Sequence, residues 1–216
     1  MSPQLYVVIG ALAAVLIPSA WRQTSHLVTL VHEAGHAFVA VLTGRRLRAI
    51  KLHSDTSGLT VTKGRTRGIT MIATAAAGYL APSVFGLIIV ALIAYDRTLW
   101  SLYIALVGLG FLLLWIRNWF GLLLILLAGS ITWLIANKTT AHFVELTAWF
   151  LGAFFLIAAP RAVWSHVLSR DVRRQSDSDV LARISPIPAW LWALTFQALT
   201  LGALVWGILL LEPLVR

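Results

Sequence analysis

The chain has 216 residues, of which 59% are hydrophobic and only 12% are charged, and its mean hydropathy is +0.86. This composition excludes an ordinary soluble globular protein and predicts an all-α polytopic membrane protein, one domain over residues 1–216 with about six to seven transmembrane helices. The formal net charge of +9 comes from basic residues that flank apolar runs, a pattern that sets membrane orientation and excludes nucleic acid as a partner. The absence of cysteine excludes disulfides and thiolate metal ligands.

The first part of the chain predicts two helices followed by a β-hairpin. The apolar run over about residues 5–20 predicts a retained membrane helix, because it lacks the basic start of a secretory signal, with a cleaved signal as the alternative. Arg22 marks the connection to a second helix over about residues 25–43. Two short β-prone runs around a turn then predict a small hairpin between Leu47 and Thr62, with a solvated basic loop as the alternative.

The rest of the chain alternates apolar runs with short polar connections. A polar segment over about residues 161–188 precedes the last helix, and within it residues 176–184 read as the start of a short amphipathic helix. Small side chains at residues 75–78 permit another helix to approach closely. The expected membrane helices after the hairpin cover about residues 68–94, 99–116, 119–136, 141–159 and 189–211.

Basic residues predict the orientation of these spans. With seven spans, all but four of the 17 lysines and arginines fall on the side of the N-terminus; the four exceptions are Arg22, Arg97, Lys138 and Arg216. The positive-inside rule then predicts a cytoplasmic N-terminus, an external C-terminus and a cytoplasmic polar segment at 161–188.

The second helix contains the motif His32-Glu33-Ala34-Gly35-His36. Because His32 and His36 are one turn apart, both imidazoles point the same way and can reach one metal ion. This is the HExxH pattern, in which two histidines hold zinc and the glutamate accepts a proton from the attacking water. A chance match on a surface helix is the alternative, but an unpartnered ionisable residue at membrane depth costs roughly 2.5 to 3.5 kcal/mol.

Two histidines leave zinc one protein ligand short of a catalytic site. The expected topology leaves Asp171, Asp177 and Asp179 on the side of the metal. Either of the last two could reach the ion from the start of the short helix, or could simply cap that helix.

The chain resembles the site-2 protease family of intramembrane zinc metalloproteases, and in particular a divergent bacterial branch of it. The resemblance rests on the HEAGH motif in an early membrane helix and on a distant aspartate on the same side. It extends to four further segments, at residues 52–58, 77–82, 117–121 and 176–179.

The resemblance implies hydrolysis of peptide bonds in or beside a bacterial inner membrane, with the site toward the cytoplasmic face. It implies one Zn²⁺ held by His32, His36 and Asp177, with Asp179 as the alternative third ligand, and Glu33 as the base. The chain departs from better-known members in having no Asp-Gly pair and no room for a PDZ or CBS module.

The expected substrate is a membrane protein or peptide, which must unwind before it is cleaved. The hairpin between Leu47 and Thr62 is the candidate substrate-binding element, by pairing with an extended substrate, and Asn118 is a further candidate. The alternative function is that of a proteolytically inactive relative that binds membrane partners, although the intact Glu33 argues against it. A metal transporter would need ionisable residues on several helices at mid-membrane, and this sequence does not have them.

Overall fold

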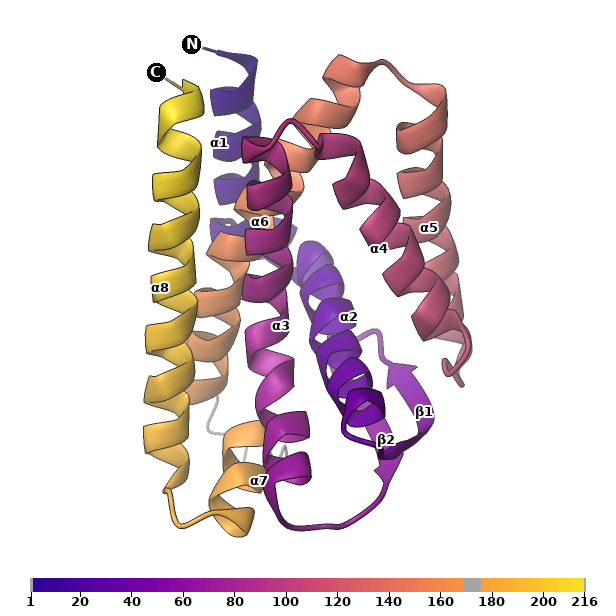
Figure 1. The fold of residues 1–216 in the computed structure, drawn as a ribbon, viewed down its shortest axis with the longest axis vertical. Coiled ribbons are helices and arrows are strands. Elements are labelled where there is room, and N and C mark those ends of the chain that lie inside the picture. The colour runs from indigo at the N-terminus through magenta and orange to yellow at the C-terminus, as the bar shows by residue number, and fades with distance from the viewer. Residues whose placement is uncertain (1, 169–175, 216) are drawn as a thin grey trace.

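The protein is a bundle of apolar helices with a β-hairpin and a short helix at one end (Figure 1). The computed structural model describes residues 2–168 and 176–215, and nearly all of this part is helical. In chain order the elements are α1 (Pro3–Leu16), α2 (Pro18–Leu42), β1 (Arg46–Leu52), β2 (Gly58–Lys63), α3 (Ile69–Ala94), α4 (Thr98–Leu113), α5 (Trp119–Lys138), α6 (Ala141–Leu168), α7 (Asp177–Ile184) and α8 (Ala189–Val215).

Four helices are long and apolar enough to cross a membrane: α3, α5, α6 and α8. A fifth crossing is possible if α1 and α2, which bend by 96° at their junction, form one broken span. α4 is apolar but shorter, and counting it as well would bring the total to the lower end of the expected range. The mostly helical membrane fold with one small hairpin is therefore confirmed, and it suits a lipid bilayer.

The break between α1 and α2 lies at Pro18, earlier than the expected connection at Arg22. Ile17 is extended, as a residue before proline prefers to be, and Pro18 starts α2, where no backbone N–H is needed. The fourteen residues of α1 span only about 21 Å, which is too short to cross a bilayer alone.

Two polar side chains replace the backbone hydrogen bonds that are lost at this break. Because Pro18 has no N–H, the carbonyl of Ala14 accepts instead from the Thr24 hydroxyl at 3.0 Å. The carbonyl of Val15 accepts from the guanidinium of Arg161 on α6, which also lies 4.6 Å from the centre of the Trp21 ring. These contacts fix the direction in which α2 leaves α1.

The hairpin is confirmed to within a residue of its expected bounds. β1 and β2 pair antiparallel, with Leu52 opposite Gly58 and Ile50 opposite Thr60. The outer edge of β1 is also paired: Ile50 exchanges backbone hydrogen bonds with Trp115 and Arg117 of the connection between α4 and α5. In the described part of the chain, no further strand pairs with the other edge of β2.

The expected polar segment at 161–188 is only partly irregular. α6 passes through Pro160 and continues to Leu168, instead of ending near residue 159, since membrane helices tolerate proline where neighbours satisfy the freed groups. Residues 169–175 lie outside the described residues, and residues 177–184 form the expected short helix, α7.

α1 begins and α8 ends at the same end of the bundle, while the hairpin and α7 lie toward the other end (Figure 1). The seven-span arrangement predicts termini on opposite faces of the membrane, whereas here α1 begins and α8 ends at one end of the bundle. The difference arises at Pro18, because α1 and α2 count as a single span if the bent pair crosses the membrane as one.

Candidate metal centre

α2 carries the HEAGH motif along its contact with α3. Gly35 faces α3, where a β-carbon at this position would overlap the Ala81 side chain and the Ala77 carbonyl. The small residues on α3 therefore allow the two helices to approach closely, as the sequence indicated. This approach leaves His36 and Glu33 buried and His32 partly buried.

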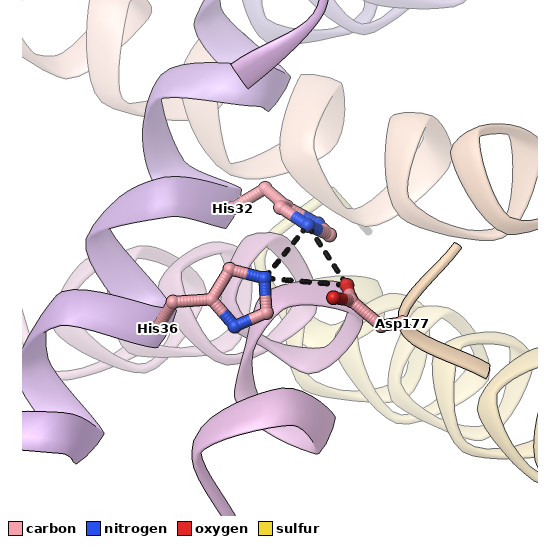
Figure 2. A group of neighbouring side chains, drawn as sticks. All are labelled: His32, His36 and Asp177. Carbon is pink, nitrogen blue, oxygen red and sulfur yellow. Dashed lines mark hydrogen bonds and ion pairs between the residues drawn. The ribbon is translucent and has the colours of Figure 1, made fainter. Parts of the chain in front are cut away.

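Three side chains from α2 and α7 meet at this place (Figure 2). Asp177 Oδ2 lies 3.0 Å from His32 Nε2 and 3.2 Å from His36 Nε2. The two Nε2 atoms are 3.0 Å apart. Among the described residues, this is one group of three histidine or carboxylate side chains whose ligand atoms converge closely enough to hold a metal ion.

The short helix α7 carries Asp177 to the two histidines. Leu181 of α7 is fully buried in a cluster with Tyr79 of α3 and Phe196 of α8, and this contact docks the helix. Ser176 caps α7, and its side chain accepts a hydrogen bond from the backbone N–H of Asp179. Asp177 is the first residue of the helix and points toward α2.

The charge of Asp177 suits a metal ligand. Burial by itself raises the pKa of its carboxyl. The neighbouring His36 and His32 lower the pKa by more than burial raises it, through charge and hydrogen bonding, so the pKa lies below its usual value. The side chain is therefore a carboxylate at neutral pH.

The geometry of this group fits zinc. Tetrahedral zinc with ligand bonds of about 2.0 to 2.1 Å places its ligand atoms about 3.3 Å apart, close to the separations of 3.0 to 3.2 Å between these three atoms. Two nitrogens and one oxygen are a common donor set for catalytic zinc. Gly78 of α3 also supports a site at this place, because a β-carbon there would overlap both imidazoles. Glycine at this position leaves room for the rings.

A backbone carbonyl orients His36. Its Nδ1 lies 2.7 Å from the carbonyl oxygen of Thr74 on α3. Because a carbonyl can only accept, Nδ1 carries the proton, and in the neutral ring the lone pair is then on Nε2, which faces Asp177 and His32.

Glu33 lies beside this group and against the hairpin. Its Oε2 accepts a hydrogen bond of 2.5 Å from the hydroxyl of Thr60 on β2. Gly58, two residues earlier on β2, is so close that a β-carbon there would overlap the Glu33 carboxyl group. One turn before Glu33, the Thr29 hydroxyl donates to the carbonyl of Thr56 at 2.8 Å and attaches the hairpin turn to α2.

The other predicted site residues lie elsewhere. Asp179 is exposed and closes the capping box, because its Oδ2 accepts from the backbone N–H of Ser176 at 3.0 Å. Asn118 uses both polar atoms of its side chain on β1: its amide group donates to the carbonyl of Leu52 at 2.5 Å, and its oxygen accepts from the Leu52 N–H at 3.1 Å. The structure thus places Asn118 at the edge of the hairpin.

Four residues around the centre were not identified from the sequence. Gly78 was noticed as part of a small-residue stretch and of a segment that resembles the family, but not as a neighbour of the histidines. Thr74 acts through its carbonyl, which leaves no side-chain signal. Gly58 closes the predicted turn, and Thr60 belongs to an ordinary β-prone run. They become visible only once α3 and the hairpin are placed against α2.

Comparison with known protein families identifies the chain. A family model described as Peptidase M50B-like matches residues 5–207. The chain therefore belongs to this family of peptidases, which confirms the resemblance to the site-2 protease family. No curated protein and no solved structure matches the chain.

Proposed function

We propose that this chain is an intramembrane zinc metalloprotease that hydrolyses peptide bonds of membrane-embedded or membrane-adjacent proteins. The observation that carries the proposal is the convergence of His32, His36 and Asp177, with Glu33 next to them on the same helix. Membership of a peptidase family supports the same activity.

The residues divide into two roles. His32, His36 and Asp177 would hold one zinc ion, which when bound supplies Lewis acidity that activates water and polarises a peptide carbonyl. Glu33 accepts the proton of the attacking water at its carboxylate and passes it to the leaving amine. The buried position of Glu33 keeps bulk solvent from competing for that proton.

The hairpin would hold the substrate by pairing with it as an extended strand. Since the outer edge of β1 is occupied by the connection between α4 and α5, the available edge belongs to β2. β2 also lies directly over Glu33, so a substrate strand on this edge would run beside the base.

The distribution of charge supports a cytoplasmic location for this end of the bundle, and the family resemblance suggests a bacterial cell membrane. The connections at the other end carry few basic residues, Arg97 and Lys138 among them. By the positive-inside rule the hairpin end faces the cytoplasm, and the start of α1 and the end of α8 lie toward the outer face. The described basic residues at the hairpin end are Arg45, Arg46, Arg48, Lys51, Lys63, Arg65, Arg67, Arg117 and Arg183.

The test compares membranes that contain the wild-type chain with membranes that contain Glu33→Gln. Newly formed N-termini of membrane proteins are labelled and identified by mass spectrometry. We expect cleavage sites in or near membrane helices with the wild type and at least about 100-fold less product with Glu33→Gln, because general acid–base catalysis contributes about 10² to 10⁴ in rate.

Glu145→Gln is the matched control, since Glu145 bonds to Gln4 on α1 and takes no part in the metal centre. This variant should cleave like the wild type. If Glu33→Gln keeps its zinc and the labelled N-termini do not differ from those of the wild type, the protein is an inactive relative that binds membrane partners.

A further inference from the structure

The middle of β2 makes a close polar contact with the proposed base. The Thr60 Oγ1 atom lies 2.5 Å from Glu33 Oε2 and 3.3 Å from the backbone carbonyl oxygen of Glu33. A hydroxyl has one proton, and the shorter distance is that of a hydrogen bond to a charged oxygen. The Thr60 hydroxyl therefore donates to the carboxylate.

The surroundings of Thr60 leave this contact little freedom. Its partner across the hairpin, Ile50, is buried in the core beside α2, so the face of the sheet that carries Thr60 is pressed against that helix. Gly58 lies on the same face two residues away and closes in on the carboxyl group of Glu33. The two residues of β2 form a slot that fits the glutamate side chain.

We propose that Thr60 is a positioning residue that holds Glu33 in the orientation needed for proton transfer. The inference rests on the proposed function, because it assigns Glu33 the role of base. A glutamate side chain has three rotatable bonds, and a general base must lie within hydrogen-bond reach of the proton that it accepts. The Thr60 hydroxyl fixes Oε2, and Gly58, which lies against Oε1, limits rotation of the carboxylate on its other side.

This contact also joins two functions in one strand. The edge of β2 is the surface proposed to pair with the substrate, while a side chain of the same strand holds the base. A substrate that orders β2 would therefore order Glu33 as well.

The kinetic test uses a fluorogenic peptide that carries a cleavage site found by the N-terminal comparison. Thr60→Val removes the hydroxyl but keeps the β-branched shape. We expect kcat to fall about 10- to 100-fold with KM within about twofold of wild type, because small misplacements of reacting groups cost up to about 10² in rate. Thr60→Ser, which retains the hydroxyl, should recover most of the kcat, and zinc content should be equal in all these proteins.

Thr29→Val is the matched control. It removes a hydroxyl that also bonds α2 to the hairpin but does not touch Glu33. It should keep the wild-type kcat. An equal fall in kcat for Thr29→Val and Thr60→Val would overturn the proposal, as would a Thr60→Val protein that has lost its zinc.

A spectroscopic readout tests the contact without relying on cleavage. The chain has three glutamates, Glu33, Glu145 and Glu212. Labelling with ¹³C-glutamate therefore gives three carboxylate infrared bands, and the band that disappears in Glu33→Gln is that of Glu33. We expect this band to shift in Thr60→Val, and to keep its wild-type frequency in Thr60→Ser and Thr29→Val. An unshifted band in Thr60→Val overturns the proposal. Absence of cleavage by the wild type would instead count against the proposed function, and the band would still decide whether Thr60 holds Glu33.

Discussion

At the scale of single residues, the site depends on which of two neighbouring aspartates faces the histidines. Asp177 lies within 3.2 Å of both imidazoles, whereas Asp179 is turned outward to cap its own helix. The two positions are separated by two residues on a helix, about 200° around its axis, so they cannot face the same side.

Substitution of the two aspartates should therefore have different effects on zinc content. Asp177→Ala should lower the affinity for zinc by more than about 100-fold, because loss of even an outer partner of a metal ligand costs about 10- to 100-fold. Asp179→Ala should keep zinc and lose only about 0.5 to 2 kcal/mol of helix capping free energy. Metal analysis of the purified proteins measures the difference. Loss of zinc in Asp179→Ala alone would reverse the assignment.

At the scale of elements, the hairpin is positioned from two sides. Thr29 and Thr60 attach it to α2, and the connection between α4 and α5 pairs with the outer edge of β1. Asn118 extends this pairing with its side chain, which bonds to both backbone polar groups of Leu52 as a neighbouring strand would.

Asn118→Ala should therefore loosen β1. Two lost hydrogen bonds of about 0.5 to 1.5 kcal/mol each predict amide exchange at Leu52 that is about 5- to 150-fold faster, as hydrogen–deuterium exchange measures. Asn137→Ala is the control, because Asn137 bonds to the carbonyl of Trp133 at the far end of α5. If exchange in β1 is unchanged while KM for the peptide rises, Asn118 instead contacts the substrate directly.

At the scale of the whole molecule, the position of the two chain ends relates the metal centre to the membrane. α1 begins at the end of the bundle opposite the hairpin, so the N-terminus and the metal centre should face different sides of the membrane. This is the reverse of the sequence-based expectation for the N-terminus, and it leaves the proposed cytoplasmic position of the site unchanged.

Single cysteines test this topology, because the natural chain has none. Ser54→Cys in the hairpin turn should react with a membrane-impermeant maleimide only after the cells are opened. Ser2→Cys before α1 and Thr140→Cys between α5 and α6 should react in intact cells. Protection of both Ser2→Cys and Ser54→Cys in intact cells would restore the seven-span arrangement.

The sequence by itself determined the features that depend on local pattern. Long apolar runs predicted membrane helices, alternation around a turn predicted the hairpin, and the spacing of His32 and His36 placed both imidazoles on one face of α2. These features need only the period of a helix or strand, so neighbouring residues are enough to recognise them. The sequence also contained a signal for the cap of α7, because Ser176 and Asp179 have the spacing of a capping box.

Only the tertiary structure decided the contacts between distant segments. His36 and Asp177 come from opposite ends of the chain, Thr60 meets Glu33 through the docking of a hairpin on a helix, and Asn118 meets Leu52 across two helices. The bend at Pro18 likewise depends on Arg161 of α6 to satisfy a carbonyl that the break leaves free. Such contacts follow from how helices pack and which backbone groups remain to be satisfied, and no local pattern records that.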